Sequence, residues 1–172
     1  PLRIQQIDLF RYLAVYHFGG LYYDMDMEVE RAFDQYSSTA CVFPVEFEES
    51  SDALLHEQGE MRLLGNYAFC APRGHPFLWR IVENIIHQRI PERKIPNDPV
   101  KRVLYTTGPV LVTQTYLDYV REDPARLADV RLLQTVPFRS NRFGVYARHR
   151  CRGQWKRHIQ RDLKERRSSS DP

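Results

Sequence analysis

The sequence lacks several features that would assign a protein to a familiar class. No stretch approaches the roughly 20 consecutive apolar residues that a transmembrane helix needs, and no signal peptide is recognisable. We therefore expect any membrane association to depend on a segment outside these 172 residues. The glycines form neither a P-loop nor a dinucleotide-binding loop, and no Ser/His/Asp or Cys/His arrangement indicates a nucleophilic enzyme.

Cysteine and one-sided charge are also scarce. Cys41, Cys70 and Cys151 are odd in number and widely spaced, which indicates neither a zinc site nor a disulfide framework, although one bridge is open if the protein is secreted. The net charge is only +3, and the excess lies in the basic segment from Gln154 onward. We therefore expect no nucleic-acid partner, because that class carries a basic footprint across its fold.

The composition is that of a globular domain. The chain is 42% hydrophobic and 12% aromatic, which suits a single core at this length. It opens on Pro1-Leu2-Arg3 without an initiator Met and runs at once into a helical pattern, so we expect a fragment of a longer protein. We predict one domain over residues 1–155 and a basic tail over 156–172, whose end, Ser168–Pro172, is disordered.

Hydrophobic periodicity predicts an α/β fold. Apolar residues recur at helical spacing over residues 3–18, Gly19-Gly20 ends that helix, and residues 21–23 form a short strand that enters an acidic loop. The other predicted elements are strands over 40–45, 66–71 and 130–133, helices over 76–89 and 107–121, and loops over 46–59 and 91–99.

The acidic loop carries Asp24 and Asp26 directly after the short strand. Residues two apart on a strand share a face, so the two carboxylates are expected to meet around one ion. Oxygen ligands suit a hard divalent cation such as Mn²⁺ or Mg²⁺. Taken alone, an Asp-X-Asp pair is more often a solvated turn, and it is the preceding strand and Gly-Gly pair that favour a site here.

The helix before this loop carries Asp8 and Arg11, three residues apart on one face. They interrupt an apolar run, Ile7–Val15. One interpretation is an exposed ion pair worth about 0–1 kcal/mol; the other is a pair that lines a site or belongs to a buried network.

Together these segments resemble the DXD sugar-transferase region of glycosyltransferase family 32, which includes fungal-type α-mannosyltransferases and inositol-phosphoceramide mannosyltransferases. The core of the resemblance is Asp8-x-x-Arg11 followed by Gly19-Gly20-x-Tyr22-x-Asp24-x-Asp26. Further matching segments are Asn66-Tyr67-Ala68-Phe69, Gly74-His75-Pro76-Phe77, Thr107-Gly108-Pro109, Tyr146-Ala147-x-His149 and Trp155.

The resemblance implies a GT-A-like (Rossmann-like) nucleotide-diphospho-sugar transferase fold over residues 1–155, lacking its first strands. It further implies a retaining enzyme that uses Mn²⁺ or Mg²⁺ to move a hexose (mannose, galactose or glucose) from a nucleotide-sugar such as GDP-mannose or a UDP-hexose. The acceptor is a hydroxyl of a glycan or glycolipid. In a eukaryote the implied location is the Golgi or another secretory-pathway membrane.

The resemblance also assigns roles to residues. Asp26 ligates the metal, Asp24 contacts the donor and the ion, and Asn66 lies near the transferred sugar, so that these three form the catalytic group. The implied donor-binding residues are Asp8, Arg11, Tyr22, Asp24 and Trp155, and the implied third metal ligand is His149. The chain departs from the family pattern where His149-Arg150-Cys151 replaces the usual His-His-Trp.

Two other functions remain open at this point. A truncated, non-catalytic relative would bind a nucleotide-sugar or a partner without turnover. A phosphohydrolase would use Asp24 and Asp26 for a different metal reaction, but that class needs further Asp or His ligands in short motifs, which the sequence does not show.

Overall fold

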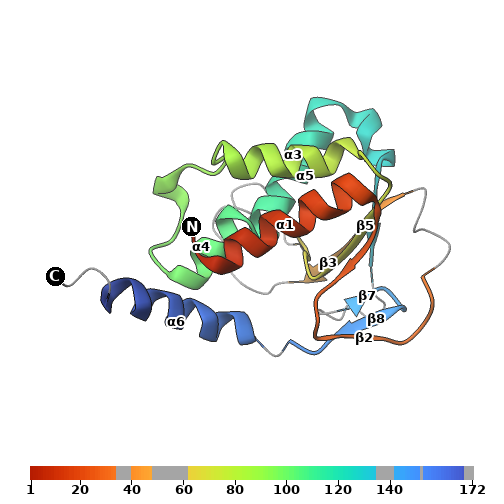
Figure 1. Ribbon diagram of the computed structural model, residues 1–172. Helices are drawn as coiled ribbons and strands as arrows, with labels where there is room; N and C mark the ends of the chain where they lie inside the picture. Colours follow the sequence, from red (N-terminus) through yellow and green to blue (C-terminus); the bar gives the residue numbers. More distant parts are fainter. Residues whose placement is uncertain (34–39, 48–61, 135–141, 152, 169–172) are drawn as a thin grey trace.

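The computed structural model describes residues 1–33, 40–47, 62–134, 142–151 and 153–168. Their backbone forms a layer of helices, a mixed sheet and a small second sheet (Figure 1). The elements, in chain order, are α1 (Arg3–Phe18), β1 (Gly20–Tyr23), β2 (Met27–Val29), β3 (Cys41–Phe47), β4 (Arg62–Leu64), β5 (Ala68–Ala71), α3 (Pro76–Ile86), α4 (Pro99–Thr106), α5 (Pro109–Glu122), β6 (Val130–Leu133), β7 (Arg142–Phe143), β8 (Ala147–His149) and α6 (Gln154–Ser168), with 3-10 turns at Glu92–Lys94 and Pro124–Ala128.

The larger sheet has the order β1-β5-β3-β4, with β6 also paired to β3. The β3–β6 pair is parallel, whereas the other pairs of this sheet are antiparallel. Its central strands, β3 and β5, are buried on both faces. Successive side chains of a strand point to opposite sides of the sheet. Phe43 and Phe69 pack toward the helices, with ring centroids 5.0 Å apart, while Val42 and Cys70 pack on the other face.

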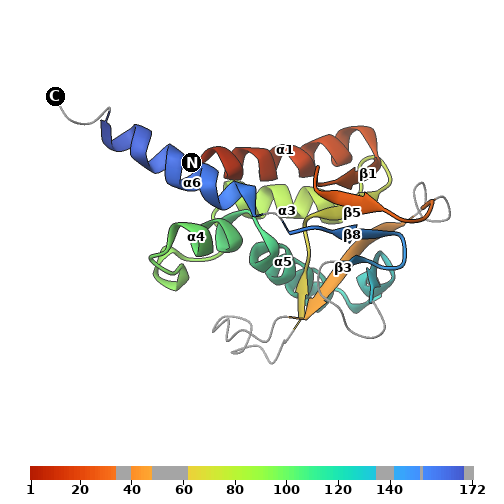
Figure 2. The same ribbon diagram turned by 90° about the horizontal axis from the view of Figure 1, so that it is seen from below.

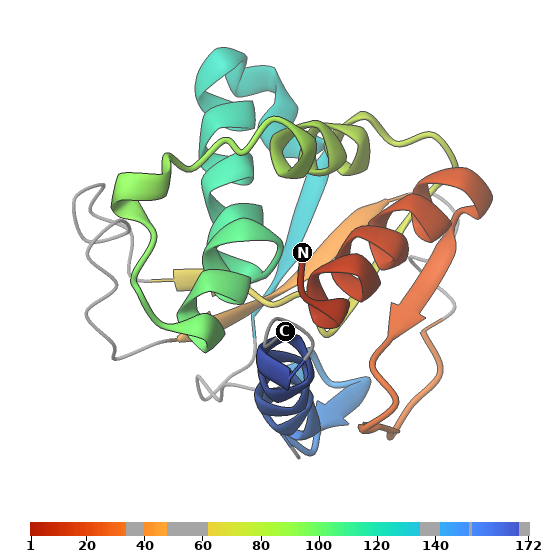
Figure 3. The ribbon, with the colours of Figure 1, turned by 60° about the vertical axis from the view of Figure 1, so that its left-hand side comes forward.

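The two faces of this sheet are covered differently. Side chains from α1, α3 and α5, such as Tyr12, Phe77 and Val112, share one apolar cluster with β3 and β5, and Figure 3 shows these helices on one side of the strands. On the other face, Phe143 and Ala147 of the second sheet, β2-β8-β7, pack against β3 and β5. The acidic loop connects β1 of the first sheet to β2 of the second, so the site lies where the two sheets meet.

The C-terminal helix belongs to the folded core. Ile159 of α6 is 2% exposed and packs with Leu2 and Val103, and Figure 2 shows α6 running past the start of α1. The boundary predicted at residue 155 therefore falls inside a helix that packs on the domain. The predicted disorder of Ser168–Pro172 concerns residues 169–172, which lie outside the described residues, and the chain is helical up to Ser168.

The α/β class is confirmed, and the mixed sheet is consistent with the GT-A-like fold that the resemblance implied. The predicted helix over residues 3–18, the strands that begin near residues 21, 40 and 130 and the helix that begins at 76 all form. The helix over 76–89 ends early, at Ile86, because Gln88 has a positive φ of 47°.

Three other predictions need correction. The loop predicted over residues 91–99 ends where α4 begins: Asp98 accepts a hydrogen bond from the backbone N–H of Lys101 at 2.8 Å, and Pro99 occupies the first turn. The strand predicted over 66–71 begins at Ala68. The loop predicted over 46–59 begins later, since β3 continues to Phe47, and residues 48–59 lie outside the described residues.

Short strands escaped prediction because two or three residues carry no periodic signal. These are β2, β4, β7 and β8. Within the described part of the chain, no helix combines the length and the apolar character needed to cross a membrane.

Candidate functional site

A tight turn brings the two carboxylates of the acidic loop together. Strand β1 ends at Tyr23, and the backbone N–H of Asp24 donates to the carbonyl oxygen of Tyr67 at 2.8 Å. The N–H of Met27 then donates to the carbonyl oxygen of Asp24 at 3.0 Å, which closes a four-residue turn. Asp24 and Asp26 therefore come together through a turn and not, as predicted, on one face of a strand, because Asp26 lies in the turn.

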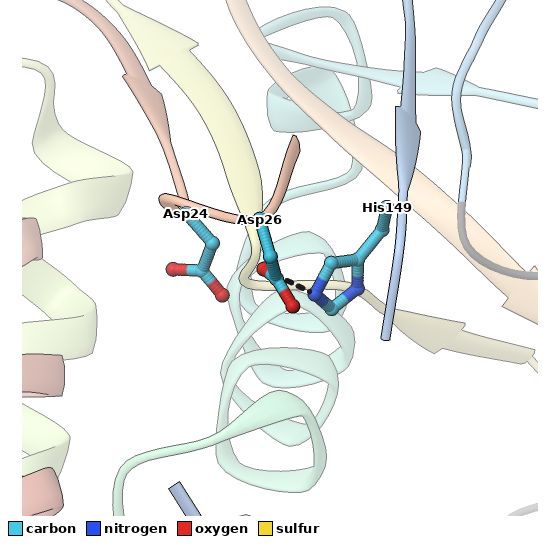
Figure 4. A group of neighbouring side chains, drawn as sticks. All are labelled: Asp24, Asp26 and His149. Carbon is cyan, nitrogen blue, oxygen red and sulfur yellow. Dashed lines mark ion pairs between the residues drawn. The ribbon is translucent and has the colours of Figure 1, made fainter. Parts of the chain in front are cut away.

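The second sheet delivers His149 to the same place. In the antiparallel β2–β8 pair, His149 is opposite Met27, and the N–H of Arg150 donates to the carbonyl oxygen of Asp26 at 3.0 Å. The His149 Nε2 atom lies 3.0 Å from Asp26 Oδ1, as the dashed line in Figure 4 marks. The Tyr67 ring stacks on the imidazole, with centroids 4.7 Å apart, and limits its rotation.

These three side chains have the donor set of a divalent-cation site. One ligand atom from each of Asp24, Asp26 and His149 lies within 4.8 Å of the other two, and Figure 4 shows the three side chains converging from the acidic loop and β8. Two carboxylate oxygens and one imidazole nitrogen suit Mn²⁺ or Mg²⁺, with imidazole favouring Mn²⁺. Figure 4 also shows that the sequence-predicted metal ligands are side by side.

A buried ion pair lies beneath Asp24. Asp8 and Arg11 face inward from α1 and are 3% and 5% exposed. One guanidinium nitrogen of Arg11 is 2.9 Å from Asp8 Oδ1, and the other is 3.0 Å from Asp24 Oδ1. The interpretation of Asp8 and Arg11 as an exposed surface pair is therefore wrong, and they form a buried network that reaches the acidic loop.

Burial and charge oppose each other in this network. Burial raises the pKa of Asp8 to about 6, although the Arg11 guanidinium and the Thr107 hydroxyl favour the carboxylate. Burial alone would lower the pKa of Arg11, but the carboxylates of Asp8 and Asp24 outweigh it and raise the pKa above its usual value. Near neutral pH one buried cation is therefore held between two carboxylates.

Tyr22 and Asn66 complete the surroundings of Asp24. The Tyr22 hydroxyl donates to Asp24 Oδ1 at 2.6 Å, and the Arg11 guanidinium lies 4.7 Å from the centre of the Tyr22 ring. The carbonyl oxygen of Asn66 accepts from Arg11 at 2.8 Å, and its amide donates to the Tyr12 hydroxyl at 3.1 Å. Both predicted residues are therefore in contact with the network.

Trp155 is not brought into this group of side chains. It is half-buried in α6 and packs against the cluster of Leu2, Val103 and Ile159. Its predicted contact with the donor stays a prediction, and the position in the fold assigns it a packing role at the α1–α6 contact.

No role was predicted for three further residues of the site, Tyr12, Tyr67 and Thr107. Tyr12 lies one helical turn after Asp8 and is fully buried, so its spacing was a signal. Tyr67 contacts Asp24 through its carbonyl oxygen and His149 through its ring. Thr107 donates to Asp8 at 2.7 Å. Tyr67 and Thr107 stand in segments that match the family pattern, but their contacts in the site are tertiary and no local pattern indicates them.

Parts of the chain are similar to known proteins. The model of the glycosyltransferase sugar-binding region containing the DXD motif matches residues 1–43. Inositol phosphoceramide mannosyltransferase 1 of Schizosaccharomyces pombe is 26% identical over 140 residues, which are 80% of this chain and 39% of that protein. Mannosyl phosphorylinositol ceramide synthase SUR1 of Saccharomyces cerevisiae is 24% identical over 144 residues, which are 84% of this chain and 33% of that protein.

A solved structure, PaToxG glycosyltransferase, superposes with a TM-score of 0.49 at 19% identity and covers 72% of this chain and 39% of that one. The alignments with the curated relatives span only 27% to 39% of their length. The family matches confirm the resemblance that the motifs indicated.

Proposed function

We propose that this protein is a glycosyltransferase of the family-32 type, with a DXD sugar-binding region, and that it transfers a hexose from a nucleotide-sugar to a hydroxyl group. The acceptor is a glycan or a glycolipid, and transfer retains the anomeric configuration. The observation that carries this proposal is the convergence of Asp24, Asp26 and His149 within 4.8 Å, next to the buried Asp8–Arg11 pair.

The donor is proposed to lie across the acidic loop. Asp26, Asp24 and His149 would hold a Mn²⁺ or Mg²⁺ ion, which would supply positive charge to stabilise a leaving nucleoside diphosphate. The protein's own part is mainly positioning. Arg11 and Tyr22 both donate to Asp24 Oδ1, so they fix the carboxylate that is to meet the sugar.

The remaining predicted residues support the sugar side of the site. Asp8 and Asn66 both contact the Arg11 guanidinium, through the Asp8 carboxylate and the Asn66 carbonyl oxygen. Because Asp8 and Arg11 are buried, we propose that they act on the sugar chiefly through Asp24. Direct contact with the sugar hydroxyls would add to that effect.

The substrates follow from the relatives by analogy. Those relatives are named for mannose and for inositol phosphoceramide. We therefore propose GDP-mannose as the first donor to test, a UDP-hexose as the second, and a glycolipid as the first acceptor. A eukaryotic source would place the protein in the Golgi or another secretory-pathway membrane.

Donor hydrolysis or transfer with and without Mn²⁺ tests the function. We expect GDP-mannose turnover that requires the metal, and Asp26→Ala is expected to reduce kcat/KM by about a hundredfold or more, because a metal ligand is lost. The matched control is Glu92→Ala, which removes an exposed carboxylate that pairs with Arg102 and lies outside the site.

Three results would contradict the proposal. Metal-independent turnover that Asp26→Ala leaves unchanged would remove the metal site from the reaction. Binding of GDP or UDP without turnover, measured by calorimetry, would instead support a non-catalytic nucleotide-sugar binder. Hydrolysis of a simple phosphate ester would favour a phosphohydrolase.

A further inference from the structure

The junction between α4 and α5 lies directly against the buried ion pair. Thr107 is the C-cap residue of α4, and Gly108 is the N-cap residue of α5. A Cβ atom on Gly108 would lie 2.9 Å from the Cα of Leu104 and 3.2 Å from the carbonyl oxygen of Val103. The close turn therefore needs glycine, and it places Thr107 against α1.

Thr107 contacts two inward-facing residues of α1. Its hydroxyl donates to Asp8 Oδ2 at 2.7 Å, across 99 residues of sequence, and its carbonyl oxygen accepts from the Tyr12 hydroxyl at 2.9 Å. Thr107 itself is 3% exposed. Its side chain is β-branched, so few rotamers are available and the direction of the hydroxyl is held.

The hydroxyl of Thr107 has a different hydrogen-bond partner from the hydroxyls of the buried threonines in α5. Thr113 and Thr115 each donate to the carbonyl oxygen four residues earlier, at 2.7 and 2.8 Å. For Thr107 the equivalent distance, to Val103, is 3.4 Å, whereas the Asp8 carboxylate is at 2.7 Å. The proton therefore lies toward Asp8, in a charge-assisted bond.

We propose that Thr107 is a positioning residue of the donor site, a role that rests on the proposed transferase function. A continuous chain of polar contacts runs from Thr107 to Asp8, from Asp8 to Arg11, and from Arg11 to Asp24. Thr107 occupies Oδ2 of Asp8, which leaves Oδ1 for Arg11 and holds the guanidinium where its other nitrogen reaches Asp24.

Loss of the Thr107 hydroxyl changes how Asp8 holds Arg11. Without it, Oδ2 is a buried acceptor that has lost its donor, and the carboxylate is free to rotate toward the guanidinium. Arg11 then moves from Asp24, and the acidic loop loses the contact that orients its sugar-facing carboxylate. Of the three proposed metal ligands, Asp26 and His149 are outside this chain of contacts and Asp24 is its last member, so we expect Mn²⁺ binding to be weakened less than by loss of Asp26.

The test compares Thr107→Val with Thr107→Ser and with Thr115→Val, a matched variant that also removes a buried threonine hydroxyl. With Mn²⁺ present, we expect Thr107→Val to raise the KM for GDP-mannose by about tenfold and Thr107→Ser to stay within about twofold of wild type. Thr115→Val is expected to leave both KM and the Mn²⁺ affinity, measured by electron paramagnetic resonance, unchanged, whereas Thr107→Val is expected to weaken Mn²⁺ binding less than Asp26→Ala does.

Amide hydrogen exchange at Asp24 provides a readout that needs no turnover. We expect exchange about tenfold faster in Thr107→Val than in Thr115→Val. Equal exchange and equal KM in Thr107→Val and Thr115→Val would overturn the role of Thr107, and so would a Thr107→Ser variant that behaves like Thr107→Val. If the wild type turns over its donor in that case, the proposed function still stands. Absent wild-type turnover would instead contradict the proposed function, and the exchange comparison would still decide whether Thr107 holds the loop.

Discussion

At the scale of single residues, the site combines one buried cation with carboxylates on both sides of it. Arg11 lies between Asp8 and Asp24, and a flat guanidinium with several N–H groups can serve both at once. A lysine ammonium is a point charge and would not span the two. The orientation of Asp24 is therefore a property of Arg11 and of the groups that hold it.

The raised pKa of Asp8 makes a prediction about stability. The pKa is about 6 in the folded protein against an ordinary value of 3.8, so the folded state binds this proton more tightly than the unfolded state. The contribution of Asp8 is thus fully present below about pH 4 and is lost as the pH rises through about 6, with a magnitude on the order of 3 kcal/mol.

Asp8→Asn removes this titration. We expect the free energy of unfolding of the wild type, relative to Asp8→Asn, to fall between about pH 4 and about pH 6 and to stay level above that range. Urea unfolding of both proteins at matched pH values measures the difference. A difference that is constant across this range would show that Asp8 does not carry the raised pKa.

At the scale of elements, α6 connects the strand that carries His149 to the start of the chain. It follows β8, which carries His149, and packs against Leu2 and Val103 through Ile159. The N–H of Arg3 also donates to Asp162 at 3.0 Å. The helix is therefore part of the domain, and its packing helps to hold β8 beside β2.

Truncation of Ile159 tests this packing. We expect Ile159→Ala to lower the free energy of unfolding by about 2–4 kcal/mol, because a side chain that is 2% exposed leaves a cavity. Gln160→Ala, on the exposed side of the same helix, is expected to change it by less than about 0.5 kcal/mol. Chemical denaturation of the two variants gives the comparison, and equal stabilities would mean that α6 is an independent tail.

At the scale of the whole molecule, the proposed ion bridges the two sheets. Asp24 and Asp26 follow β1 of the larger sheet, and His149 belongs to β8 of the smaller one. His149 Nε2 and Asp26 Oδ1 lie 3.0 Å apart across the two sheets. A metal that binds the folded protein alone stabilises the folded state by mass action.

Thermal unfolding with and without Mn²⁺ therefore reports on the site. At free Mn²⁺ of about 100 times its Kd, we expect about 2.7 kcal/mol of added stability and a higher Tm. Addition of EDTA is expected to reverse the shift, and His149→Ala is expected to reduce it strongly. A shift of equal size in His149→Ala would place the ion elsewhere.

The local features of the protein follow from the amino-acid sequence alone. The helix over residues 3–18, its Gly-Gly end and the acidic loop were all predictable, because periodicity, glycine conformations and charge are properties of neighbouring residues. The motif order also identified the family resemblance and most of the residues that meet at the site.

Which of these residues come into contact depends on tertiary packing. The pairing of β2 with β8 places His149 against Asp26, the packing of α1 buries Asp8 and Arg11, and the α4–α5 junction places Thr107 on Asp8. Trp155 packs at the α1–α6 contact, against the cluster that contains Leu2 and Ile159. These contacts join segments far apart in the chain, and their partners are chosen by burial and strand register, which a local pattern does not encode.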